Sequence, residues 1–434
     1  MNSIKKIFDK EIFFFLSILL LPFFYISGSL LLNLSIVLIL ILGIYFSEIN
    51  YLKNFFLKHK FFIISFIFFV ILNILYSETK YFSASKVVFY TRFIIFPLTY
   101  IIVISKLSDL KLKIITKIFL YLIIFVILDS LIQLIFGKDI FGFPYFYPYH
   151  RITGPFGDEM IVGFYLLNFG IITAAFLNYF NLIKKNTNIF IFLFLSIVIL
   201  LTGERSAYLS FLIFLFFLFI FSKNKKIIFT TLLCVSLSFL ILINSIDFLN
   251  NKYPLKNIIQ DSNVMNENSN LSDKNKNKIE DLDLSLTKIN SFIPLNKWIG
   301  HFQRANEIIE KNLFFGSGFR NYRIICFDYQ KKYFDKKNID KCSTHPHNFH
   351  LEIISDNGFI GYLFFLIFIF YFFRTFIKGK HNSNLGITMI FCLILSFVFP
   401  FKTTGSIFTT NYAFVFWYLV ANYFFLIKKE KNLK

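Results

Sequence analysis

The feature that most limits how this chain can fold is its series of long apolar runs. A helix needs about 20 apolar residues to cross a bilayer. Twelve segments approach this length, at residues 12–31, 33–48, 61–76, 87–105, 114–136, 159–182, 188–202, 205–221, 226–246, 356–377, 384–401 and 407–427. The chain is 56% hydrophobic, more than a water-soluble domain can bury. We therefore predict an all-α polytopic membrane protein with about twelve transmembrane helices, while the short and closely spaced runs leave eleven or thirteen open.

The distribution of Lys and Arg predicts the orientation of these spans. With the N-terminus in the cytoplasm, the inside segments hold about 22 Lys and Arg residues and the short outside segments hold about six. Both termini are then cytoplasmic. The predicted organisation is nine spans in residues 1–246, a large periplasmic loop with short helices in residues 247–355, and three spans with a cytoplasmic tail in residues 356–434. The Lys residues lie in small groups between the runs, so the net charge of +20 does not indicate nucleic acid.

The large loop divides into two parts. Residues 261–278 are rich in Asn, Ser, Asp and Lys and are predicted to be mobile. Further on, apolar residues recur at helical spacing, at Trp298, Phe302, Ala305, Ile308, Ile309 and Leu313. We expect an amphipathic helix there, with Arg304, Glu307 and Lys311 on its polar face. Gly316 and Gly318 then indicate a helix stop and a turn.

Two cysteines, Cys326 and Cys342, lie in this loop, whereas Cys234 and Cys392 lie within apolar runs. If the loop faces an oxidising compartment, Cys326 and Cys342 can form a disulfide. The alternative, two free thiols, stays open on the sequence alone.

Charged residues near the predicted outer membrane boundary are candidate ligands for an anionic substrate. Arg205 lies in a turn between two spans, where a guanidinium suits a phosphate through bidentate hydrogen bonds. Arg151 and Glu159 flank a stretch with Gly and Pro, which indicates either a turn with a charged helix cap or part of a site. Arg92 and Asp129 lie inside spans, in the outer half of the bilayer. They indicate either functional residues or a structural ion pair.

A cluster of histidines, His345, His347 and His350, ends the loop and leads into the tenth span. Their spacing lacks a helical ligand pair and no carboxylate motif accompanies them, so we expect no metal. A neutral imidazole can instead take a proton from a sugar hydroxyl near neutral pH. Because Pro346 favours an extended backbone, the rings of His345 and His347 are expected to point to opposite sides.

Taken in order, these motifs make the chain similar to the bacterial superfamily of O-antigen polymerases and O-antigen ligases, which are polytopic membrane glycosyltransferases. The matching residues are Thr202-Gly203-Glu204-Arg205-Ser206, Arg304 followed by Leu313-Phe314-Phe315-Gly316-Ser317-Gly318-Phe319, and His347-Asn348-Phe349-His350-Leu351-Glu352 followed by Asp356-Asn357-Gly358-Phe359-Ile360-Gly361. The twelve-span layout and the large loop also agree. Where the family often has Pro before the Leu-Phe-Gly turn, this chain has Asn312.

The resemblance implies a donor glycan on undecaprenyl diphosphate, used at the periplasmic face of the bacterial inner membrane without a metal or other cofactor. It implies that Arg205 and Arg304 bind the diphosphate and that His347 activates the acceptor hydroxyl, which attacks with inversion. The candidate supporting residues are His345, Arg151, Glu159, Arg92 and Asp129. The implied partners are the donor, a glycan acceptor and the lipid bilayer, with a chain-length regulator as a further candidate and no nucleic acid.

The long loop and the stretch from Arg151 to Glu159 favour a polymerase of lipid-linked repeat units. The alternatives within the superfamily are a ligase that moves glycan to lipid A core and a protein O-oligosaccharyltransferase. A flippase for the same lipid-linked glycan is a different class, which needs charges along a central cavity, whereas the candidates here lie in the outer half and the loop. A cell-envelope binding protein without chemistry is the last alternative.

Overall fold

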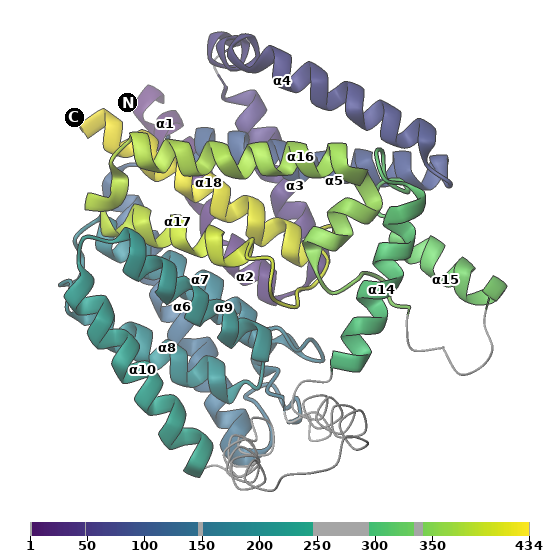
Figure 1. Ribbon diagram of the computed structural model, residues 1–434. Helices are drawn as coiled ribbons and strands as arrows, with labels where there is room; N and C mark the ends of the chain where they lie inside the picture. The colour runs from purple at the N-terminus through teal and green to yellow at the C-terminus, as the bar shows by residue number, and fades with distance from the viewer. Residues whose placement is uncertain (1, 48, 146–150, 246–294, 334–341, 434) are drawn as a thin grey trace, which may run out of the picture.

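Figure 1 shows the computed structural model of the chain, which describes residues 2–47, 49–145, 151–245, 295–333 and 342–433. Within these ranges the chain forms α-helices and short 3-10 turns and contains no β-strand. This confirms the predicted all-α class. The segment 261–278, predicted to be mobile, lies outside the described residues.

Many of the helices follow one another with short connections, whereas residues 137–161 form a longer one between α6 and α7. They are α1 (Asn2–Leu19), α2 (Leu21–Ile26), α3 (Ser29–Tyr45), α4 (Ile49–Tyr76), α5 (Lys80–Ile104), α6 (Asp109–Phe136), α7 (Val162–Tyr179), α8 (Thr187–Leu201), α9 (Arg205–Phe221), α10 (Lys225–Ser245), α14 (Leu295–Lys311), α15 (Tyr322–Tyr333), α16 (Phe349–Lys378), α17 (Leu385–Phe397) and α18 (Thr410–Leu433).

Each of the twelve predicted segments coincides with an apolar helix, the first of them with α1 and α2 together. Seven helices in the described part are long and apolar enough to cross a membrane. Five further apolar stretches, among them α3 and α17, are shorter. The chain is therefore a polytopic membrane protein, and twelve spans remains a prediction.

Burial divides the helices into a central and an outer group. Every residue of α7 from Val162 to Leu177 is buried, because α7 packs against α6, α8, α9 and α17 and is apolar nearly all round. The outer helices α4, α10 and α16 instead expose large apolar side chains, such as Phe68, Ile241 and Phe370. In a membrane protein such surfaces face lipid, because helices satisfy their backbone hydrogen bonds internally.

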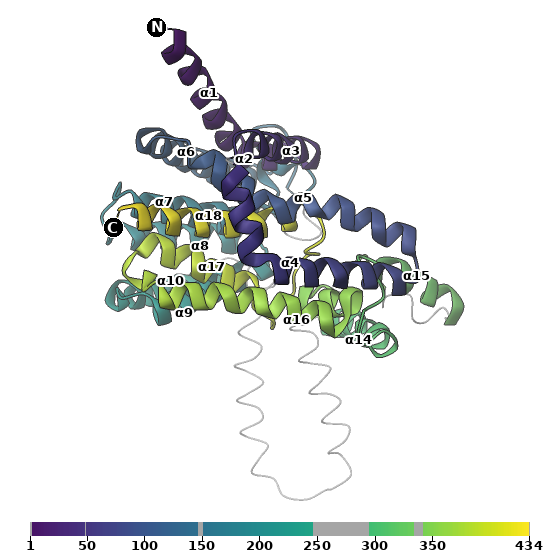
Figure 2. The same ribbon diagram turned by 90° about the horizontal axis from the view of Figure 1, so that it is seen from above.

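The bundle has two distinct ends. Figures 1 and 2 both show α14 and α15 at one end, here the loop end, and the two chain termini toward the other, here the terminal end. Helix α16 begins at the loop end, where α14 packs against it, and α18 ends at the terminal end. The loop end therefore brings together helix starts and connecting segments that lie far apart in the sequence.

The turn after α14 docks onto a kink in α16. Gly358 interrupts the helix with a φ of 66°, which favours glycine. The kink leaves backbone groups of α16 free to form hydrogen bonds with the turn. Phe359 N donates to Leu313 O at 2.8 Å. Gly318 N donates to Asp356 O at 2.9 Å. A Cβ on Gly316 would lie 2.4 Å from Asp356 O, so only glycine fits this approach. The predicted helix stop and turn is thus confirmed, and it fixes α14 on α16.

Helix α14 confirms the predicted helix but not its polar face. Ala305 and Ile308 are buried as expected, whereas Arg304 is only 5% exposed. Arg304 shares one helical stripe with His301 and Ile308, since residues three and four apart lie on the same side. The prediction that Arg304 shares the polar face with Glu307 and Lys311 is therefore wrong for Arg304.

Candidate active site

Three histidines meet at the loop end. The ring centroids of His345 and His347 lie 4.2 Å apart, and those of His301 and His347 lie 5.2 Å apart. The expectation that the His345 and His347 rings point to opposite sides is wrong. His347 has a φ of 54°, so the segment turns at this residue instead of staying extended. His301, which the sequence reasoning missed, comes from the buried face of α14.

The segment that carries His347 is held by the connection between α17 and α18. Thr404 N donates to His347 O at 2.8 Å. The Asn348 side chain caps α16 by accepting from the backbone N–H groups of His350 and Leu351. Its amide nitrogen also donates to Pro400 O at 2.7 Å. The backbone on both sides of the His347 ring is thereby fixed to a second, distant part of the chain.

His345 lies in an electropositive, partly dry environment. Burial is the main reason that the pKa of His345 is lowered to about 4; the Thr404 backbone opposes this effect, and the nearby His301 and Arg323 add to it. Its Nδ1 lies 3.1 Å from the Thr344 hydroxyl. His345 is therefore neutral near pH 7 but accepts protons weakly, and His347 is the better candidate base.

His350 has a structural role. Its Nδ1 lies 3.0 Å from the Tyr362 hydroxyl and its Nε2 lies 2.8 Å from Val398 O, so both ring nitrogens are engaged within the bundle. It does not join the other histidines in a metal-ligand set. Within the described ranges, no group of three or more His, Cys, Asp or Glu side chains is arranged to hold a metal ion.

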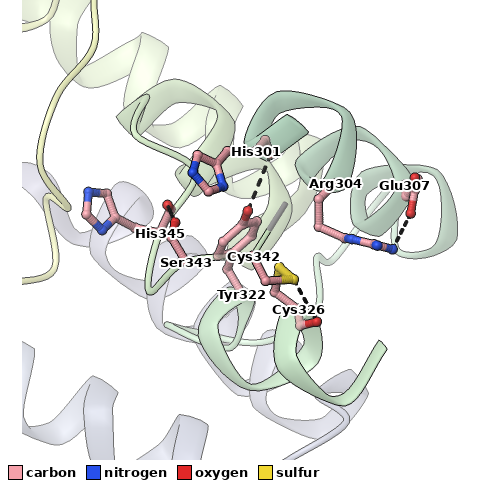
Figure 3. Close-up of a disulfide and its surroundings, with 8 residues drawn as sticks. All are labelled: His301, Arg304, Glu307, Tyr322, Cys326, Cys342, Ser343 and His345. Carbon is pink, nitrogen blue, oxygen red and sulfur yellow. Dashed lines mark hydrogen bonds and ion pairs between the residues drawn. A yellow bond between two sulfur atoms is a disulfide. The ribbon is translucent and has the colours of Figure 1, made fainter. Parts of the chain in front are cut away.

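Arg304 lies one helical turn from His301 but turns away from the histidines. Figure 3 shows its side chain extending away from His345 toward Glu307, and its Nη1 lies 2.5 Å from the Glu307 carboxylate. Glu307 is half exposed, so the pair is partly screened by solvent and contributes little to stability. Arg304 is thus a buried cation on the same helix as His301, and its ion pair with Glu307 is weak.

The sequence reasoning also missed two arginines, Arg320 and Arg323. Both act electrostatically on the buried carboxylate of Glu352, near the start of α16. Burial and the neighbouring Arg323 lower the pKa of Arg320. The signal was present in the run Phe319-Arg320-Asn321-Tyr322-Arg323 directly after the docked turn. Together with Arg304, these side chains give the loop end a concentration of positive charge.

A disulfide joins Cys326 of α15 to Cys342, which confirms the predicted pairing (Figure 3). Cys326 belongs to a small core with Ala305, Ile308 and Tyr322. The Tyr322 hydroxyl donates to His301 O at 3.3 Å, and its backbone N–H donates to the Asp356 carboxylate at 2.7 Å. The disulfide therefore ties the segment before His345 to the helices that position His301.

We expect the disulfide to stabilise the loop end by about 3 kcal/mol, because it closes a ring with a sequence separation of 16. In a Cys234→Ala, Cys392→Ala background, no thiol should react with a maleimide on intact cells until a reductant is added. Cys326→Ala with Cys342→Ala should then unfold at lower temperature than this background. Labelling of two thiols without reductant would refute the pairing.

Arg205 and its neighbour Glu204 take different positions. Glu204 is buried and accepts from the backbone N–H groups of Gly163 at 2.9 Å and Phe164 at 3.0 Å, so it caps the start of α7. Arg205 is the first residue of α9 and is exposed. Glu204 thus holds the start of α7 beside the start of α9. Arg205 is exposed at this junction.

A small cavity of about 20 Å³ opens beside this junction. Its walls come from α7, α9, α16, α17, α18 and the connection between α17 and α18, with the residues Phe164, Ser206, Ala207, Ser210, Phe349, Phe397, Lys402, Thr403, Thr404, Gly405, Ile407 and Tyr412. Ser206 follows Arg205 in the chain. Thr404 bonds to the backbone of His347. The cavity, here the Lys402 cavity, thereby adjoins both segments.

The stretch from Arg151 to Glu159 reaches the same end. Glu159 is exposed and accepts from the Asn411 side chain at 3.2 Å, at the start of α18. Arg151 acts electrostatically on Tyr412, which lines the cavity. Both residues therefore lie near the cavity without lining it.

Arg92 and Asp129 do not join the site. Arg92 on α5 donates to the Asn33 side chain at 3.0 Å and to Phe89 O at 2.8 Å. Asp129 on α6 accepts from the backbone N–H of Ile140 at 2.8 Å. The alternative of an Arg92–Asp129 ion pair is therefore wrong, because each side chain finds other partners. Neither residue lines the Lys402 cavity.

The helical fold, the histidine cluster and the cations at one end define a polytopic membrane protein with a polar site built on its loop end. Residues 190–366 match the O-antigen ligase family, and this range contains Arg205, Arg304 and His347. This match supports the superfamily of O-antigen ligases and polymerases that the sequence motifs predicted. The match supports a ligase or polymerase type of function on lipid-linked glycans. No curated protein matches the chain.

Proposed function

We propose that the protein polymerises lipid-linked oligosaccharide repeat units by metal-independent glycosyl transfer from undecaprenyl diphosphate. The observation that carries this proposal is the contact of His347 with two other histidines, beside cations and a cavity at the loop end. Such a site can activate an acceptor hydroxyl and stabilise an anionic leaving group without a metal.

In the proposed reaction, His347 takes the proton from an acceptor hydroxyl, and the hydroxyl oxygen attacks the anomeric carbon of the donor glycan. The bond from that carbon to the phosphate oxygen breaks, and undecaprenyl diphosphate leaves with the bonding electrons. Arg205 and Arg304 bind the diphosphate, whose negative charge increases as it leaves. Arg304 would release Glu307 to do so.

Supporting roles follow from position. His345 is neutral and lies beside His347. It therefore places no positive charge next to the His347 ring before that ring takes the proton of the acceptor hydroxyl. Arg151 and Glu159 lie at the edge of the Lys402 cavity, where they can contact glycan hydroxyls. Arg92 and Asp129 keep at most a supporting structural role, because their partners lie elsewhere in the bundle.

We propose that the loop end faces the periplasm and that both termini are cytoplasmic, in a bacterial inner membrane. The disulfide supports this, since disulfides persist in oxidising compartments. Lysines at the terminal end also support it, because cytoplasmic segments are enriched in positive charge; they include Lys106, Lys428 and Lys429. The proposed division into residues 1–246, 247–355 and 356–434 follows from this orientation.

Reporter fusions test the orientation directly. An alkaline phosphatase reporter should be active at Lys274 and inactive at Lys434, and a cytoplasmic reporter should give the reverse pattern. Each fusion needs a check of its membrane level by immunoblot. The same side for both positions would refute the proposed topology and the periplasmic site.

The long loop favours a polymerase, whereas the family match favours an O-antigen ligase as the second candidate. A polymerase and a ligase differ in the molecule that accepts the glycan. We expect the full chain in proteoliposomes to convert a lipid-linked repeat unit into a ladder of longer lipid-linked products. Lipid A core and a Ser-rich acceptor peptide serve as competing acceptors in parallel reactions.

The products separate the candidates. Glycan on lipid A core would indicate the ligase, and glycan on the peptide would indicate the protein oligosaccharyltransferase. Movement of the donor between leaflets without a new glycosidic bond would indicate a flippase and refute glycosyl transfer. A chain-length regulator as partner would narrow the ladder when it is added to the same vesicles.

A further inference from the structure

The Lys402 cavity contains a cation, Lys402, from the connection between α17 and α18. Lys402 is half-buried, and its ammonium donates to the Ser210 hydroxyl at 2.8 Å. It also lies 5.8 Å from the centre of the Phe397 ring. The side chain thus points into the cavity between α9 and α17 rather than out to bulk water.

No carboxylate balances this charge in the part of the chain that the structure describes. Within the described ranges, the ammonium forms one hydrogen bond, to the neutral hydroxyl of Ser210. Burial lowers the pKa of Lys402 to about 7, and no nearby acidic group counteracts that effect. A desolvated cation without an anion is costly. An anionic ligand would therefore stabilise this site more than a neutral one.

The walls of the cavity indicate the class of ligand. The hydroxyl groups of Ser206 and Thr404 can donate to anionic oxygens, whereas Ser210 already donates to Ser206 O. Phe164 and Phe349 offer apolar surface. The free space of about 20 Å³ is little more than one water molecule needs, so only a small group such as the oxygens of one phosphate can enter, and an oligosaccharide cannot. A polar pocket with apolar walls in a membrane protein therefore fits a lipid phosphate.

We propose, on the basis of the proposed function, that Lys402 binds a phosphate group of the lipid-linked donor within this cavity. The phosphate takes one hydrogen bond from the ammonium in place of, or beside, that from Lys402 to Ser210. Because Thr404 bonds to the His347 backbone and Ser206 follows Arg205, a phosphate here lies between the two segments that carry the proposed chemistry.

The test measures binding and stability of the full chain in detergent, without turnover. Lys402→Met removes the charge and keeps the length and apolar stem of the side chain. It should raise the unfolding temperature of the ligand-free protein, because a partly desolvated charge is lost. It should also weaken binding of undecaprenyl diphosphate by about 10- to 150-fold, the loss expected for one hydrogen bond to a charged group.

Two further variants serve as controls. Lys402→Arg keeps the charge and should retain most of the binding, which also covers the case in which Lys402→Met folds poorly. Lys106→Met removes a lysine that lines a different cavity, at the terminal end, and should leave binding unchanged. Opposite effects on stability and binding in Lys402→Met are not expected of a residue that only supports the fold.

The probes distinguish the sources of the phosphate. Inorganic pyrophosphate should show the same ranking of variants with weaker affinity. Unchanged binding of undecaprenyl diphosphate by Lys402→Met would overturn the proposal. A loss confined to phosphatidylglycerol vesicles would assign the cavity to a membrane lipid headgroup and would also overturn it. Failure of the proposed function appears separately, as donor binding without any glycan product.

Discussion

Replacing His347 should lower the rate of glycan assembly by about 10²–10⁴-fold, the usual loss when a general base is removed. The informative variant is His347→Asn. His347 has a φ of 54°, a backbone conformation that Asn adopts more readily than Ala. His347→Asn therefore removes the base with little strain, whereas His347→Ala adds a folding penalty to the chemical one. The measurement is the initial rate of product formation at saturating donor, with membrane levels checked by immunoblot.

His345 provides the matched control. Its ring lies 4.2 Å from that of His347, and its lowered pKa makes it a weak proton acceptor. His345→Asn should lower the rate by less than His347→Asn does, while donor binding stays similar in both. If His345→Asn abolishes assembly and His347→Asn does not, the base is His345. If both variants assemble glycan at the normal rate, the base mechanism is refuted.

The helices were predictable because their signal is local. An apolar run long enough to cross a bilayer specifies a helix whatever surrounds it, and all twelve segments coincide with apolar helices. The turn at Gly316 was predictable for the same reason. Its partner was not, because docking against the kink at Gly358 joins residues about 40 positions apart.

The site was less predictable because it depends on how distant segments pack. Pro346 suggested an extended backbone, but the bond from Thr404 N to His347 O holds His347 in a left-handed turn. His301 reaches the cluster only because α14 packs on α16. Lys402 became notable only once α9 and α17 enclosed it. None of these contacts has a signature in the surrounding sequence.

The charge of Arg304 led to the wrong prediction that it lies on the polar face of α14. Its spacing from His301 and Ile308 placed it on the buried stripe, yet its charge suggested the polar face. The ion pair between buried Arg304 and half-exposed Glu307 contributes little to stability. Its burial beside the histidines is more consistent with binding an anion that enters the site.

We expect Arg205→Ala and Arg304→Ala each to lower donor use by about 10²–10³-fold, the range found when one donor to a developing negative charge is removed. Arg→Lys at either position should retain part of the activity, because the charge remains but the bidentate geometry is lost. The measurement is kcat/KM for the lipid-linked donor, together with binding of undecaprenyl diphosphate. Loss of both quantities indicates contact with the diphosphate rather than with the acceptor.

Glu307→Gln separates a binding role of Arg304 from a structural one. If Arg304 serves only to pair with Glu307, Glu307→Gln should reduce activity as much as Arg304→Ala does. If Arg304 binds the donor, Glu307→Gln should leave activity intact or increase it, because the guanidinium no longer has to leave a carboxylate at 2.5 Å. Arg205 has the simpler test, since it is exposed at the start of α9 and its loss should not disturb packing. Normal donor binding by Arg205→Ala would exclude the diphosphate role for that residue and move the anion contact toward the buried cations.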